Sequence, residues 1–118
     1  MQSDAEKAQE LWDLKVRPRW EEDGVRWRLI RVSRTEHMKG FWARTADNDR
    51  IEIITNHEAL CLLKEAAERE LTAKECSVEF DASFCTVFDN SGRESRCIAE
   101  EDSEHAALIA ALKEVRGT

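Results

Sequence analysis

The stretch 55–71, TNHEALCLLKEAAEREL, decides the fold because a helix begins inside it between two regions that alternate like strands. Thr55 and Glu58 form a capping box, in which the threonine hydroxyl accepts a backbone N–H near Glu58 while the glutamate side chain reaches back. Apolar residues then recur at helical spacing. They are Ala59, Leu60, Leu63, Ala66, Ala67 and Leu71. The stretch predicts an amphipathic helix of about four turns.

Two further helix starts lie toward the ends of the chain. Ser3 and Glu6 form another capping box, and apolar residues follow it at helical spacing. Ser103, or the residue before it, caps a last helix that Gly117 ends. The apolar stripe of this last helix is Leu108, Ala111, Leu112 and Val115. The predicted helices therefore begin near Asp4, Asn56 and Ser103.

Between the helices, apolar and polar residues alternate, as in strands with one buried face. The alternation is clearest in segments 25–29 and 76–81. Two hairpins are predicted, one around Asp47-Asn48-Asp49 and one around Asn90-Ser91-Gly92. Their strands are 41–45 with 50–54 and 83–88 with 93–99. The predicted order is α-βββ-α-βββ-α, an α+β fold with antiparallel sheets and helices packed on one face.

A short internal similarity suggests a duplicated βββα unit. His57-Glu58-Ala59-Leu60 matches His105-Ala106-Ala107-Leu108 at an offset of 48, which the caps Thr55 and Ser103 share. The length fits a single domain, 1–118, with candidate repeat units 15–72 and 74–117. Chance similarity is the alternative. If the duplication holds, Leu60 should superpose on Leu108.

The charge of the chain is unevenly distributed. The net charge of −7 divides into −3 for residues 1–14, +4 for 15–50 and −8 for 51–118. The first residues are polar and acidic, unlike a signal peptide. The longest apolar run, Ala106–Leu112, is far shorter than the ~20 residues that span a bilayer. We expect a cytoplasmic protein without a membrane partner.

The cysteines are Cys61, Cys76, Cys85 and Cys97, and none forms a C-x-x-C pair. Without an export signal, we interpret them as buried free thiols. A zinc site of Cys76, Cys85, Cys97 and His105 has suitable ligand types, but its spacing matches no compact zinc motif. We therefore expect no metal and no cofactor.

An acidic cluster marks the start of the last helix. Its members are Glu100, Glu101, Asp102 and Glu104. They could bind a partner with a basic surface by imitating nucleic-acid phosphates. The alternative is structural, because carboxylates at a helix N-terminus are favourable by ~0.3–1 kcal/mol each.

A second candidate surface is basic and aromatic. Arginines and tryptophans interleave between residues 17 and 44, and Arg26 and Arg28 fall on one strand face. The proposed binding residues are Arg26, Arg28, Arg31 and Trp42. Such a face could bind nucleic acid or an acidic protein. Alternatively, these arginines pair with the acidic half of the chain and the tryptophans are core residues.

His57 and His105 stand in first turns of predicted helices, where they could act as neutral bases. Cys61 follows His57 by one turn, but it lies within the apolar run A-L-C-L-L. A core cysteine beside a surface histidine is therefore the preferred interpretation. We expect a protein that is not an enzyme.

The chain also resembles two known kinds of domain. The helical segments HEALCLLKEA (57–66) and EHAALIAALKEV (104–115), with hairpin strands between them, resemble small α-β-α sandwich domains of uncharacterised phage proteins. The order α-βββ-α is similar to that of double-stranded RNA-binding domains. Those domains carry a lysine-rich start to their last helix, whereas residues 100–105 here read EEDSEH. Only the topology is carried over.

These features favour a small acidic protein-binding module. The phage resemblance suggests an inhibitor of a host nucleic-acid-handling defence enzyme, as anti-CRISPR and anti-restriction proteins are. A nucleic-acid-binding domain that uses the arginine and tryptophan residues, or an immunity protein for a toxin, are the alternatives.

Overall fold

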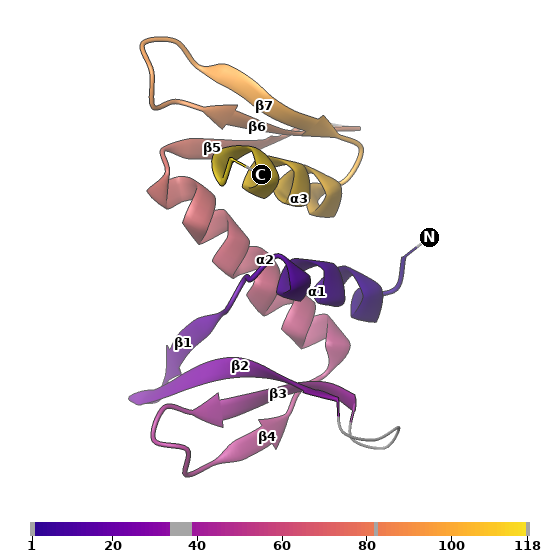
Figure 1. Ribbon diagram of the computed structural model, residues 1–118, viewed down its shortest axis with the longest axis vertical. Helices are drawn as coiled ribbons and strands as arrows, with labels where there is room; N and C mark the ends of the chain where they lie inside the picture. The colour runs from indigo at the N-terminus through magenta and orange to yellow at the C-terminus, as the bar shows by residue number, and fades with distance from the viewer. Residues whose placement is uncertain (1, 34–38, 82, 118) are drawn as a thin grey trace. The chain divides into compact units, whose positions relative to one another are not determined.

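The computed structural model describes residues 2–33, 39–81 and 83–117. These residues form three helices and seven strands (Figure 1). By internal contacts the chain divides into a first unit, residues 1–66, and a second unit, residues 67–118. The predicted α+β class with antiparallel sheets is confirmed. The unit boundary falls inside the middle helix, whereas the sequence-based units meet after it, and the internal repeat stays a prediction.

The first unit combines a helix with a four-stranded antiparallel sheet. Helix α1 spans Asp4–Asp13, and the strands are β1 (Arg19–Glu22), β2 (Val25–Ser33), β3 (Lys39–Thr45) and β4 (Ile51–Ile53). They lie in the order β1-β2-β3-β4, so each strand pairs with its neighbour in the chain. Helix α2 (Asn56–Ala73) begins in this unit and ends in the second.

Strand β1 is absent from the sequence-based prediction, which has three strands here. Its residues, RWEE, show no apolar alternation. The overlooked signal is the dipeptide Asp23-Gly24 between β1 and β2. Both residues have a positive φ, 52° for Asp23 and 77° for Gly24. Such a two-residue turn matches the twist of a hairpin, and it pairs Glu22 directly with Val25.

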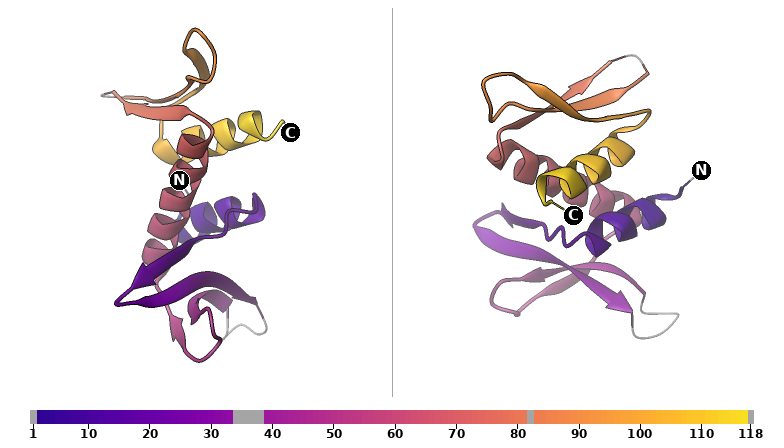
Figure 2. Two further views of the ribbon diagram at one scale, coloured as in Figure 1. Left: turned by 90° about the vertical axis from the view of Figure 1, so that its left-hand side faces the viewer. Right: turned by 45° about the horizontal axis from the view of Figure 1, so that its top comes forward.

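The core of the first unit lies between the sheet and α1. Trp27, Leu29, Phe41 and Ala43 are buried on the same face of β2 and β3. The rings of Trp12 from α1 and Phe41 pack in a T-shaped arrangement, with ring centroids 5.9 Å apart. Figure 2 shows α1 beside this sheet. Because side chains alternate along a strand, the other face of the sheet points away from α1.

The second unit also combines a helix with an antiparallel sheet, here of three strands. They are β5 (Cys76–Phe80), β6 (Cys85–Asp89) and β7 (Arg96–Glu101), in the order β5-β6-β7. Helix α3 (Glu104–Val115) packs against β6 and β7 (Figure 2). Val87 of β6 and Leu108 and Leu112 of α3 are fully buried.

The three predicted helix starts are confirmed. The helices begin at Asp4, Asn56 and Glu104. The hydroxyls of Ser3, Thr55 and Ser103 each accept a hydrogen bond from the backbone N–H three residues later, at 3.2, 3.1 and 3.2 Å. These caps satisfy amide groups that the helix itself leaves without partners. Local sequence therefore fixes where each helix begins.

Candidate functional site

The predicted acidic cluster is divided between two faces of the second sheet. Glu100 and Glu101 are consecutive residues of β7, so their side chains point to opposite faces. Glu101 lies opposite Cys85, which is buried, and Glu100 lies opposite Thr86 on the other face. Glu101 therefore shares a face with the start of α3, and Glu100 does not.

Two exposed phenylalanines adjoin Asp102 and Glu104, the other two members of the predicted acidic cluster. Phe80 is 65% exposed and Phe84 is 49% exposed. They stand at the turn between β5 and β6, where the Asp81 N–H donates to the Phe84 carbonyl at 2.8 Å. Phe80 lies on the same face of the sheet as the buried residues Val87 and Cys85, but it occupies the last row, opposite Cys85.

These residues surround a shallow hollow of about 180 Å³ at the N-terminus of α3. We call it the acidic hollow. Its lining consists of Phe80, Asp81, Ser83, Phe84, Cys85, Asp102, Ser103 and Glu104. Burial raises the pKa of the Cys85 thiol, and the negative charges of Glu104 and Glu68 raise it further. The hollow thus joins carboxylates to aromatic rings, which is the chemistry that receives a lysine or arginine side chain.

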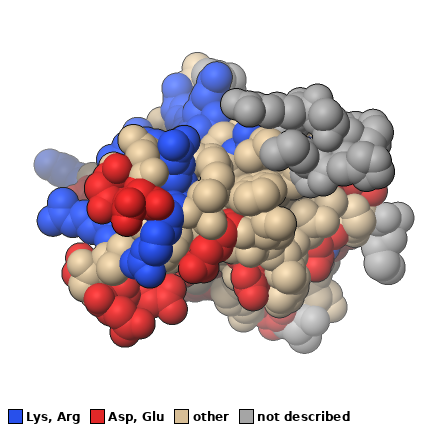
Figure 3. Space-filling model, turned by 90° about the horizontal axis from the view of Figure 1, so that it is seen from below, with Lys and Arg blue, Asp and Glu red and all other residues tan. Residues whose placement is uncertain are grey.

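The outer face of the first sheet carries a row of arginines. Arg28 of β2 lies between Arg19 of β1 and Arg44 of β3 in the strand register. The next row consists of Ile30, Trp42 and Ile53, and Ile53 is 72% exposed. We call these two rows the arginine face. Figure 3 shows Lys and Arg side chains beside an uncharged area, bordered by Asp and Glu.

Arg31 does not belong to this face, although the sequence grouped it with Arg26, Arg28 and Trp42. It pairs with Phe41, whose side chain is buried on the face that α1 covers. The Arg31 Nε donates to Gln9 of α1 at 2.8 Å, and its guanidinium lies 5.0 Å from the centre of the Phe41 ring. Arg31 therefore ties the sheet to α1, because odd and even strand positions face opposite ways.

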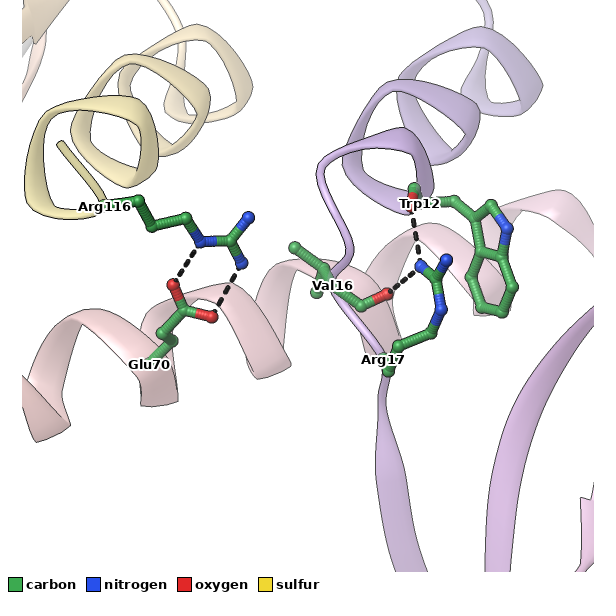
Figure 4. A network of polar contacts seen from close by, with 5 residues as sticks. All are labelled: Trp12, Val16, Arg17, Glu70 and Arg116. Carbon is green, nitrogen blue, oxygen red and sulfur yellow. Dashed lines mark hydrogen bonds and ion pairs between the residues drawn. The ribbon is translucent and has the colours of Figure 1, made fainter. Parts of the chain in front are cut away.

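Several arginines, Arg28 of the arginine face among them, lie beside other residues of the first unit. Arg26 lies directly opposite Glu21, and Arg28 donates to the side chain of Asn48 at 2.8 Å. Arg17 stacks 3.5 Å from the centre of the Trp12 ring and donates to the Trp12 and Val16 carbonyls (Figure 4). Trp27 is a core residue, as the structural alternative expected. Arg17 and Arg31 contact α1 and the residues just after it, whereas that alternative paired the arginines with the acidic half of the chain.

The cysteines do not all lie in the core. All four are free thiols, with Cys76 and Cys85 buried and Cys61 and Cys97 exposed. The expectation that Cys61 is a core residue is wrong, because the buried face of α2 runs through Ala59, Leu60 and Leu63 instead. No three His, Cys, Asp or Glu side chains among the described residues cluster closely enough to hold a metal ion.

The histidines occupy different environments. His57 exposes 75% of its side chain, and its Nδ1 lies 3.3 Å from an Asp4 carboxylate oxygen. Its Nε2 lies 3.7 Å from the Cys61 sulfur. His105, in contrast, is buried in α3 with 4% exposed. Of these two histidines, His57 therefore stands where solvent and a thiol both reach it.

Comparison with protein families, curated proteins and solved structures found no match. In the part of the chain that the structure describes, no helix is both long and apolar enough to cross a membrane.

Proposed function

We propose that the protein is a non-enzymatic module that binds another protein, and that its acidic hollow receives a lysine or arginine side chain from a basic segment of that partner. The observation that carries this proposal is the exposure of Phe80 and Phe84 beside the carboxylates of Asp102 and Glu104. Exposed aromatic rings are enriched at protein interfaces. The carboxylates select a cationic side chain and strengthen its contact with the rings.

Charge favours a basic protein over nucleic acid at this site. The second unit carries six basic and twelve acidic side chains, a net charge of −6. Phosphates would be repelled by such a surface, whereas a basic protein would be steered toward it. The grooves in which enzymes hold nucleic acid are basic, because they bind phosphates. We extend the proposal to inhibition of such an enzyme, the role expected for a phage or mobile-element protein.

A defined probe tests the binding chemistry. The probe is a fluorescent arginine-rich peptide, compared by anisotropy with a glutamate-rich peptide of equal length and with bare DNA and RNA. We expect the basic peptide to bind with at least about tenfold preference, and added salt to weaken it because screening acts over ~8 Å at physiological ionic strength. Tight binding of bare DNA or RNA would contradict the proposal.

Matched double variants test the role of the rings. Replacing Phe80 and Phe84 with alanine should weaken peptide binding by roughly tenfold, which corresponds to about 1.4 kcal/mol. The control replaces Ile51 and Ile53 with alanine, because this pair is similarly exposed in the first unit. The control should bind like the wild type. Equal losses in both double variants would mean that the hollow is not the binding site.

A second candidate function is nucleic-acid binding by the arginine face. The row of Arg19, Arg28 and Arg44 beside Trp42 favours it, because cations could follow phosphates while the indole stacks on a base. The net charge of −7 opposes this approach. The DNA and RNA measurements above distinguish the two functions.

A further inference from the structure

The N-terminal ends of α1 and α2 bring a carboxylate, an imidazole and a thiol together in the first unit. His57 contacts Asp4 through Nδ1 at 3.3 Å and Cys61 through Nε2 at 3.7 Å. Cys61 follows His57 by one helical turn, so both side chains lie on the same side of α2. Asp4 reaches the imidazole from α1, more than fifty residues earlier in the chain.

We propose that Cys61 is a reactive thiol and a site of reversible modification by small-molecule disulfides. In this arrangement His57 accepts the thiol proton, and Asp4 is a positioning residue. A nucleophile, a base and a group that orients the base form the arrangement that activates thiols. In the neutral tautomer that donates from Nδ1 to the Asp4 carboxylate, Nε2 carries no proton and faces the sulfur.

The reaction needs no group beyond these three and the disulfide itself. The proton of the Cys61 thiol passes to His57 Nε2, and the resulting thiolate attacks one sulfur of the disulfide. A new sulfur–sulfur bond forms to Cys61 while the original bond breaks. The departing thiolate takes the proton back from Nε2 and leaves as a thiol. His57 ends unchanged, and a second thiol reverses the reaction by the same route.

The other cysteines differ in the features that the proposal requires. Cys76 and Cys85 are buried, and burial raises the pKa of each thiol. Cys97 is exposed like Cys61, but its thiol donates to the Ala99 carbonyl at 3.6 Å. A carbonyl accepts a hydrogen bond without taking the proton. Cys97 is therefore an internal control with similar access and a different neighbour.

Single-thiol variants test the proposal in the intact protein. Cys97→Ser leaves Cys61 as the exposed thiol, and Cys61→Ser leaves Cys97. The probe is neutral dipyridyl disulfide at neutral pH, with the released thiopyridone followed by absorbance. We expect Cys61 to react roughly tenfold faster than Cys97. In urea the two rates should become equal, because the arrangement is lost with the fold.

Substitutions of His57 and Asp4 test whether the reaction rate of Cys61 depends on these neighbours or only on the exposure of its thiol. His57→Ala in the Cys97→Ser background should lower the rate to that of Cys97. Asp4→Asn should lower it by less than His57→Ala does, and Asp4→Glu should restore part of the loss. With oxidised glutathione, peptide mapping should locate the adduct on Cys61. Equal rates for Cys61 and Cys97, or an unchanged rate after His57→Ala, would overturn the proposal.

Discussion

The helices that follow the two sheets begin with the same local signal but bury stripes of different width. In α2 and α3 a hydroxyl residue caps the helix, a histidine stands two positions later, and a buried leucine stands five positions later. Yet His57 exposes 75% of its side chain, whereas His105 is 4% exposed. The cap determines where each helix begins, and the elements that pack against the helix determine how much of its surface is buried.

The buried stripes show how this difference arises. Positions four, five and eight after the cap are buried in both helices: Ala59, Leu60 and Leu63 in α2, and Ala107, Leu108 and Ala111 in α3. Helix α3 also buries Leu112, nine positions after its cap, where α2 has Lys64. The wider stripe of α3 includes the histidine. A shared pattern in the sequence therefore left the histidine environments undetermined.

The largest expected difference between the units is the effect of removing each histidine on stability. His105→Ala should lower the free energy of unfolding by about 2 kcal/mol, because it leaves a cavity in the core of the second unit. His57→Ala should change it by less than about 0.5 kcal/mol, because the side chain is exposed. Urea unfolding followed by circular dichroism measures both. Equal effects would show that the buried stripes of the helices do not differ in this way.

A smaller effect is expected from the ion pair at the end of α3. Arg116 donates two hydrogen bonds of 2.8 Å to the Glu70 carboxylate (Figure 4). These bonds hold the pKa of Glu70 below its usual range. Arg116→Met should cost about 1 kcal/mol of unfolding free energy at neutral pH.

The contribution of this pair should depend on pH in a defined direction. Because the pKa of Glu70 is lowered by folding, the stabilisation is complete above the pKa that glutamate has in the unfolded chain. It is lost as pH falls through the lower, folded value. The difference between wild type and Arg116→Met should therefore shrink in acid. Arg96→Met is the control, since Arg96 meets Asp89 at 3.7 Å and is largely exposed; it should cost less than about 0.5 kcal/mol.

Local patterns predicted most of the fold. The three caps, the two hairpins and the α+β class follow from hydroxyl residues, turn residues and apolar alternation. Strand β1 was missed because RWEE has no alternation and pairs through the turn at Asp23-Gly24. Such a strand is held in place by its pairing register with the neighbouring strand, and its own sequence does not reveal that register.

The candidate sites were less predictable than the fold. Arg31 was grouped with Arg28 because both lie in a basic stretch, but the strand places them on opposite faces. Alternation in segment 76–81 groups Phe80 with the buried face of β5, but it does not indicate where the cover of that face ends, and Phe80 is exposed. The contact of His57 with Asp4 joins distant segments, so no local pattern could reveal it.

The difference in charge between the units bears on function most directly. Residues 1–66 carry twelve basic and thirteen acidic side chains, a net charge of −1, against −6 for residues 67–118. The arginine face belongs to the nearly neutral unit, and the acidic hollow belongs to the strongly negative one. If the protein binds basic partners, the second unit should hold the binding site.

Charge reversal on each surface tests this central claim most directly, with the fluorescent arginine-rich peptide as probe. One variant combines Asp81→Lys with Asp102→Lys in the acidic hollow, and the other combines Arg28→Glu with Arg44→Glu on the arginine face. We expect the first to weaken binding by at least about tenfold and the second to leave it within about twofold of wild type. Loss of binding only in the arginine variant, or equal binding by both, would contradict the account.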